Sequence, residues 1–73
     1  MLIRSQDKKK ITNDLCLEIV ENEYTHAFEI FNNSVGVIGE YSTEEKAIKS
    51  LDLVCFYYKE DAVYYMPKDN DLN

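Results

Sequence analysis

Ser42-Thr43-Glu44-Glu45 opens the most informative stretch of the chain, STEEKAIKSLDLVCFYYKE, which runs from residue 42 to residue 60. Its spacing is that of a capping box, with Ser42 as N-cap and Glu45 reaching back from the third helical position. No Gly or Pro interrupts the remainder of the stretch, so we expect a helix from Thr43 to about Glu60. One stripe at spacings of three and four residues is expected to face the core: Ala47, Ile48, Leu51, Val54, Cys55 and Tyr58.

The opposite side of this expected helix carries Leu53, Phe56 and Tyr57. Three large apolar side chains on one exposed face of so small a domain indicate an interface. We therefore predict self-association through Leu53, Phe56 and Tyr57, as a two-fold dimer in which this face meets itself. The alternatives are direct docking on a target, or a helix whose outer face is covered by the C-terminal tail.

Segments of alternating hydrophobicity precede the helix and predict strands. They are Leu15–Glu21, His26–Phe31 and Val35–Tyr41, separated by polar residues at 22–25 and by the turn Asn32-Asn33-Ser34. Short turns between successive strands are typical of an antiparallel meander. Gly36 and Gly39 inside the third segment indicate a bulge or a close backbone approach.

The two ends complete the architecture. Met1–Ser5 and a strand that starts at Ile11–Asn13 are expected to form an N-terminal hairpin around Asp7–Lys10. Ala62–Met66 is expected to form a short closing strand that Pro67 stops. The prediction is an α+β fold: an antiparallel meander sheet with one long helix packed across it, in the order β-β-β-β-α-β. We expect residues 1–67 to form a single domain and residues 68–73 to form a frayed acidic tail.

Charge is unevenly distributed over the 73 residues, whose net charge is −6. Residues 1–10 hold four basic side chains and one acidic one, a balance of +3, which leaves −9 for the remainder. This composition argues against direct nucleic-acid binding, which needs clustered Lys and Arg. An acidic surface suits a basic protein partner, and the partner-binding candidates are Glu18, Glu29, Glu40 and Glu44. Ordinary solubility is the alternative explanation of the charge.

Catalytic chemistry finds little material in the sequence. His26 is the one histidine, and its place in a strand favours a packing or surface role. Cys16 and Cys55 are interpreted as two small buried side chains, reduced in the cytosol, rather than as a redox pair. No metal-ligand spacing, phosphate-binding loop or cofactor motif is present, and no window approaches the roughly 20 apolar residues that span a bilayer. We predict a protein that is not an enzyme and has no cofactor or membrane partner.

Two segments carry a resemblance: LIRSQDKK at residues 2–9 and GEYSTEEKAIK at residues 39–49. Together they resemble a family of short uncharacterised proteins from Gram-positive bacteria and their phages and mobile elements. Tyr65-Met66-Pro67, followed by acidic residues, is similar to the closing segment of that family. The middle, from Cys16 to Val35, does not align with it. The resemblance implies a small, accessory, cytoplasmic protein of a bacterial host, and it transfers no catalytic or binding residues.

Three functions then compete. The first is inhibition of a bacterial defence nuclease by protein binding, in the manner of an anti-CRISPR protein whose acidic surface blocks a basic nucleic-acid groove. The second is a sponge for a nucleotide immune signal, for which Arg4 and the tyrosines at positions 24, 41, 64 and 65 are the available material. The third is a structural or regulatory interaction protein. The sequence does not decide the identity of the partner, the choice between occlusion and mimicry, or the role of residues 4–10.

Overall fold

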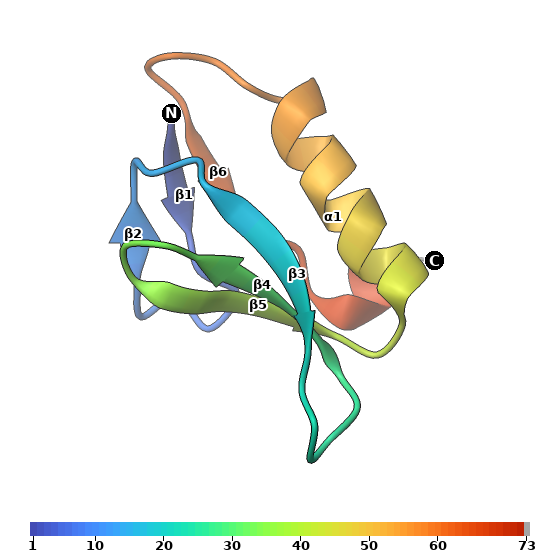
Figure 1. Cartoon of the computed structure of the whole chain (residues 1–73). Helices are drawn as coiled ribbons and strands as arrows, with labels where there is room; N and C mark the ends of the chain where they lie inside the picture. Colours follow the sequence, from blue (N-terminus) through green and yellow to red (C-terminus); the bar gives the residue numbers. More distant parts are fainter. Residues whose placement is uncertain (73) are drawn as a thin grey trace.

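The computed structural model describes residues 1–72 and has an α+β fold, as expected (Figure 1). Its elements are β1 (Leu2–Arg4), β2 (Ile11–Thr12), β3 (Leu17–Glu21), β4 (Phe28–Asn32), β5 (Gly36–Tyr41), α1 (Glu44–Phe56), β6 (Val63–Tyr65) and the 3-10 helix η1 (Asp69–Asp71). Five strands precede the helix rather than four, because β2 pairs with β1 whereas β3 is a separate strand that pairs with β4.

The predicted meander is the antiparallel sheet β3-β4-β5. Its pairing places Ile19 opposite Ile30, and Ile30 opposite Gly39. The register then shifts, so that Phe31 lies opposite Val37 and Ile38 is the extra residue of a bulge in β5. Gly36 and Gly39 lie on either side of this irregular part of β5. Gly36 has a φ of +88°, a backbone conformation that residues with a side chain rarely adopt.

The remaining strands form a second sheet in the order β2-β1-β6. The expected N-terminal hairpin is present, with Ile3 opposite Thr12. The closing strand β6 runs parallel to β1, with Tyr64 opposite Ile3. Residues 5–62, which include the meander and α1, form the long connection that a parallel pair requires. The strands are therefore divided between two small sheets.

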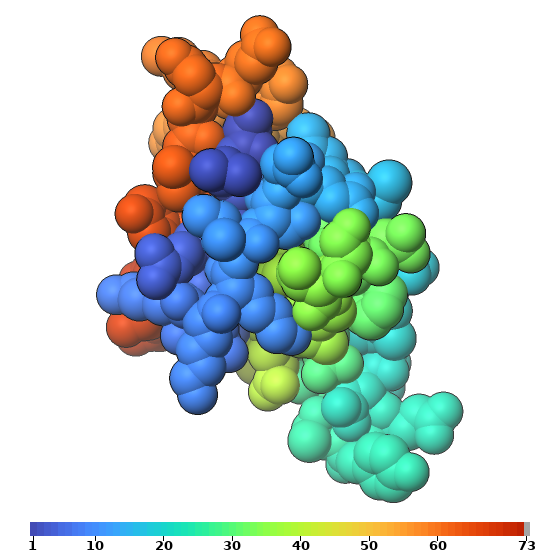
Figure 2. All heavy atoms as spheres, turned by 90° about the vertical axis from the view of Figure 1, so that its left-hand side faces the viewer, coloured from blue at the N-terminus to red at the C-terminus, as the bar shows by residue number. Residues whose placement is uncertain are grey.

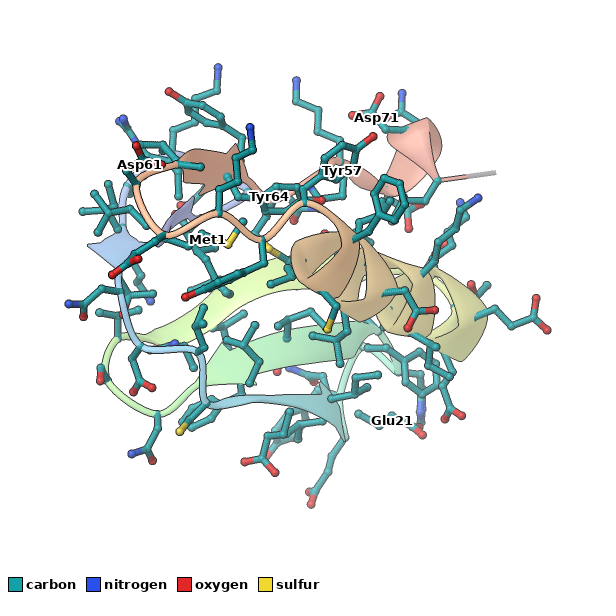
Figure 3. All side chains as sticks on the ribbon, turned by 90° about the horizontal axis from the view of Figure 1, so that it is seen from above. Met1, Glu21, Tyr57, Asp61, Tyr64 and Asp71 are labelled. Atoms are coloured by element: carbon teal, nitrogen blue, oxygen red, sulfur yellow. The ribbon has the colours of Figure 1, made fainter. Side chains whose placement is uncertain are left out.

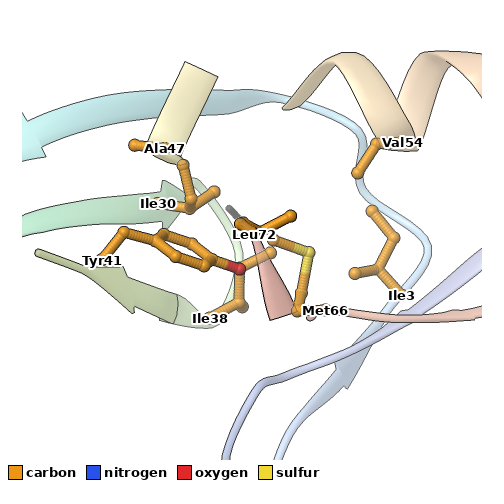
Figure 4. Close-up of a cluster of buried hydrophobic side chains, with 8 residues drawn as sticks. All are labelled: Ile3, Ile30, Ile38, Tyr41, Ala47, Val54, Met66 and Leu72. Atoms are coloured by element: carbon orange, nitrogen blue, oxygen red, sulfur yellow. The ribbon is translucent and has the colours of Figure 1, made fainter. Parts of the chain in front are cut away.

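Helix α1 lies over one face of β3-β4-β5 and contacts all three strands (Figure 1). The core beneath it consists of Ile3, Ile30, Ile38, Tyr41, Ala47, Val54, Met66 and Leu72 (Figure 4). The predicted buried stripe is only partly right: Ala47 and Val54 are buried and Leu51 is half-buried. Ile48, Cys55 and Tyr58 are exposed, and that part of the prediction is wrong.

Ser50 takes a place in the core where helical periodicity predicts a larger side chain. It is fully buried, and its hydroxyl donates to the Ala47 carbonyl over 2.7 Å, which satisfies the polar group within the helix. Small side chains at Ala47 and Ser50 let the helix lie close to the sheet, where the Tyr41 ring fills the space. The helix is thus rotated away from the stripe that hydrophobicity alone selects.

Both ends of α1 differ from prediction. The N-cap is Thr43, whose hydroxyl accepts from the Lys46 N–H over 3.2 Å, and not Ser42. At the other end the helix stops at Phe56 rather than near Glu60, and the Tyr57 N–H caps the carbonyl of Leu53. The Tyr57 ring stacks on Tyr64 of β6 with centroids 6.1 Å apart, which connects the end of the helix to the strand that pairs with β1.

The C-terminal segment is packed onto the fold, and the prediction of a frayed tail is wrong for residues 68–72; residue 73 lies outside the described part. Leu72 is 3 % exposed and belongs to the core. The Tyr41 hydroxyl donates to the Pro67 carbonyl over 2.7 Å. Asp69 accepts from the Ser42 N–H at 2.8 Å and pairs with Lys46 at 3.3 Å, which explains why Ser42 is not the N-cap.

Candidate protein-binding surface

The face of β3-β4-β5 that points away from α1 carries most of the predicted acidic residues. Strand alternation turns Ile19 and Ile30 toward the helix. The residues directly before and after each of them in its strand point outward. The outward side chains are Glu18 and Val20 of β3, Glu29 and Phe31 of β4, and Glu40 of β5; we call this set the acidic sheet face. Three of the four partner-binding candidates therefore share one surface.

Within the acidic sheet face, charged and apolar side chains alternate across the strands. Glu18 lies opposite Phe31, and Val20 lies opposite Glu29. Glu29 also lies directly opposite Glu40 on its other side. Like charges in directly opposed positions destabilise a sheet. The Glu29 carboxylate accepts from the Asn22 amide at 3.5 Å, and Val20 and Phe31 remain exposed.

Glu44 does not belong to this surface. It lies in the first turn of α1, on the other side of the sheet, next to Glu45. Negative charge at this end of a helix is favoured by the helix dipole and by the unpaired N–H groups of the first turn. The position of Glu44 therefore has a local explanation in helix stability, which the other three glutamates lack.

The hairpin between β3 and β4 projects from the body at one end of the acidic sheet face (Figure 2). The side-chain oxygen of Asn22 accepts from the N–H groups of Tyr24 and Thr25, and His26 has a φ of +59°. Tyr24 at the tip is 91 % exposed. His26 pairs with Glu21 at 3.3 Å on the surface, in keeping with a surface role for the single histidine.

The basic N-terminal arm, residues 4–10, lies beyond β5, at the edge of the sheet away from β3 (Figure 2). The Gln6 N–H donates to the Ile38 carbonyl over 2.7 Å, which fixes the arm against that edge. The Arg4 guanidinium donates to the Lys8 carbonyl, and the Lys10 ammonium to the Val37 carbonyl over 3.2 Å. Both cations therefore donate hydrogen bonds to backbone carbonyl oxygens, Arg4 within the arm and Lys10 to β5.

Several acidic groups outside the acidic sheet face are held by hydrogen bonds within the fold. The Ser5 hydroxyl lowers the pKa of Asp7, and the Ser34 hydroxyl lowers the pKa of Asp14. The Ser42 N–H does the same for the pKa of Asp69. Each of these carboxylates ties together residues of a turn or a chain end, so we assign them structural roles.

The predicted self-association residues do not share one outward face. Leu53 is half-buried and packs against the core, so the expectation that it faces solvent is wrong. Phe56, 78 % exposed, and Tyr57 are outward as expected, and their rings meet edge to face at 5.0 Å. They line an aromatic groove of about 430 Å³ together with Tyr58, Tyr64, Met1 and Val63. Figure 3 labels Met1, Tyr57 and Tyr64 among these residues.

Cys16 and Cys55 are both free and exposed, so the prediction of buried thiols is wrong. A hydrogen bond to Asp14 raises the pKa of Cys16, which keeps that thiol protonated and less nucleophilic. Residues 1–72 contain no group of three or more potential metal ligands from His, Cys, Asp and Glu. No helix among them has the length and apolar character needed to cross a membrane.

Sequence alternation contained the signal for the apolar part of the acidic sheet face, because Phe31 is two residues from Glu29 and must share its side of β4. The bulge in β5 and the strand register were needed to place Glu40 beside them. Comparison with family models, with curated proteins and with solved structures finds no match to this chain.

Proposed function

We propose that this chain is a non-enzymatic phage or mobile-element protein that inhibits a bacterial defence nuclease by stoichiometric protein binding. The acidic sheet face docks on a basic nucleic-acid groove, in the manner of an anti-CRISPR protein, in the cytoplasm of the host. The observation that carries the proposal is the opposition of Glu29 and Glu40, flanked by Glu18, around exposed Val20 and Phe31. The resemblance to mobile-element proteins supplies the biological context.

Electrostatic repulsion between Glu29 and Glu40 in the free protein supports this docking. Two glutamates opposed across a ladder destabilise the free protein, and a sheet that served only folding would place Thr or Lys at one of them. A cationic groove removes the repulsion and gains charge-assisted contacts in the same step. The exposed Phe31 ring and Val20 supply the apolar centre that a protein interface needs beside its charges.

Salt dependence distinguishes this docking from apolar association. Long-range attraction between opposite charges speeds encounter, so the association rate with a guide-free or guide-loaded CRISPR effector of a Gram-positive host should fall as ionic strength rises. The dissociation rate should change much less. Stopped-flow or surface-plasmon measurements over a salt series separate the two rates. An association rate that is independent of salt would contradict electrostatic docking.

Charge reversal tests the surface itself. Glu29→Lys and Glu40→Lys should each weaken binding to the nuclease and restore cleavage, while thermal unfolding shows the domain intact. Asp52→Lys is the matched control, because Asp52 is exposed on α1 and the substitution changes the net charge by the same amount. If all three variants lose binding equally, net charge and not this surface is responsible. If the wild-type protein binds no effector, the proposal fails.

A further inference from the structure

The free edge of β3 is unpaired in the described part of the chain. The sheet order is β3-β4-β5, so no strand within residues 1–72 pairs with the other side of β3. The Asn22 N–H bonds to the Ala27 carbonyl, and the Asn33 N–H to the Cys16 carbonyl. By the alternation of an antiparallel ladder, the peptide groups of Leu17, Ile19 and Glu21 therefore point away from β4. Figure 3 shows β3, ending at Glu21, at the border of the ribbon with no strand beyond it.

An apolar groove lies beside this edge, between β3 and α1. Its volume is about 460 Å³, and it is lined by Leu15, Leu17, Leu51, Val54, Cys55 and Tyr58. We call it the β3 groove. Leu15 is 45 % exposed and Tyr58 is 51 % exposed, although both are large apolar side chains. Four of the six lining residues belong to the helical stripe whose periodicity predicts burial, yet the monomer leaves this side of the stripe open.

An open strand edge next to an apolar groove is the arrangement that accepts an added β-strand. Main-chain hydrogen bonds to Leu17, Ile19 and Glu21 would hold such a strand, and the groove would receive its side chains. A chain of this size buries about 60 % of its unfolded surface, so covering the groove adds apolar burial that the small core lacks.

The β3 sequence fits a second copy of itself. A two-fold axis through Ile19 would pair Ile19 with Ile19 of the partner subunit, and Leu17 with Glu21 of the partner subunit. It would also place Glu18 opposite Val20 of the partner subunit. In this register every glutamate of β3 lies opposite an apolar residue, so the pairing opposes no like charges. The same patch meets itself, as a two-fold interface requires.

We propose that the chain forms a two-fold dimer by antiparallel pairing of β3 with β3 of a second copy, with the two β3 grooves closed against each other. The two sheets join into one of six strands. The acidic sheet faces of the two copies then form one continuous surface. Of the residues that line the β3 groove, Tyr58 alone also lines the aromatic groove. The proposed interface does not depend on the identity of any nuclease partner.

Sedimentation velocity on the full chain, from micromolar to high-micromolar concentration, tests the dimer. The wild type should sediment as a dimer at the upper end. Leu15→Asp places a charge in the β3 groove and should raise the dimer dissociation constant by at least about tenfold. Glu21→Pro removes an outward N–H at an edge position where the β3–β4 ladder loses nothing, and it should have the same effect. Phe56→Asp, in the aromatic groove, is the matched control and should leave the dimer unchanged.

Amide hydrogen exchange locates the interface. The amides of Leu17, Ile19 and Glu21 should exchange more slowly in concentrated than in dilute wild-type protein, and at equal rates in folded Leu15→Asp. A wild type that stays monomeric at high-micromolar concentration overturns the proposal. A dimer broken by Phe56→Asp and not by Leu15→Asp overturns it as well, and assigns self-association to the aromatic groove. Failure of nuclease binding in the charge-reversal variants leaves these measurements unaffected.

Discussion

Replacement of Leu72 by Ala tests whether the C-terminal segment is part of the fold. Leu72 is 3 % exposed and lies beside Ile30, Tyr41 and Met66 (Figure 4). The substitution removes three carbons, and at about 0.8 kcal/mol for each buried methylene the transfer loss is about 2.4 kcal/mol. A cavity adds to this loss, but a segment at the chain end relaxes more easily than a central strand. We expect a total of about 2–3 kcal/mol.

This loss is large for so small a domain. At about 0.05–0.15 kcal/mol per residue, 73 residues have a total stability of about 4–11 kcal/mol. With a urea m-value of about 1 kcal/mol/M for a small protein, the unfolding midpoint should fall by about 2–3 M. Leu2→Ala is the matched control, because Leu2 is 40 % exposed, and it should cost less than about 1 kcal/mol. Equal losses for the two variants would refute the packing of the C-terminal segment.

Glu40→Gln removes the charge opposed to Glu29, so it should stabilise the free protein by about a few tenths of a kcal/mol, measured by urea titration. The same substitution should weaken nuclease binding. A loss of stability would show that Glu29 and Glu40 do not repel each other. The Ser42 N–H lowers the pKa of Asp69 from its ordinary value of 3.8, so the carboxylate contributes stability above that value and loses it as the pH falls through its lower folded pKa. Asp69→Asn should therefore flatten the decline of melting temperature on acidification, and parallel curves for variant and wild type would contradict the linkage. Asp14→Asn should speed alkylation of Cys16 at neutral pH, because Asp14 raises the pKa of that thiol, and an unchanged rate measured by mass spectrometry would exclude the effect.

Local patterns in the sequence predict most of the secondary structure. The turn at Asn32–Ser34 and the alternation on either side of it place β4 and β5, because strand alternation and turn preference act between residues close in the chain. The polar residues Ser42 to Glu45 place the start of α1 to within one residue for the same reason. Local patterns also locate the three-residue strands β1 and β6, although they do not identify the pairing between them.

The acidic sheet face depends partly on the sequence of each strand and partly on how the strands pair. Alternation is enough to put Glu18 and Val20 on one side of β3, and Glu29 and Phe31 on one side of β4. Only the pairing of β4 with β5, with its bulge at Ile38, brings Glu40 opposite Glu29. The β3 groove is not predictable from sequence. Helical periodicity identifies Leu51 and Tyr58 as part of an apolar helix face, but it does not show whether another segment of the chain packs against them.

Sequence patterns alone are enough to predict an α+β domain with a hairpin, a meander and one helix, since these depend on contacts between neighbours along the chain. Long-range packing is needed to explain why Ser50 rather than Ile48 is buried, because a small hydroxyl bonded to Ala47 lets the helix approach the sheet. The same packing joins β6 to β1 in parallel and makes Leu72 part of the core. These outcomes depend on contacts between residues that are tens of positions apart in the chain and share one small core. A local sequence pattern does not determine which of these residues become buried.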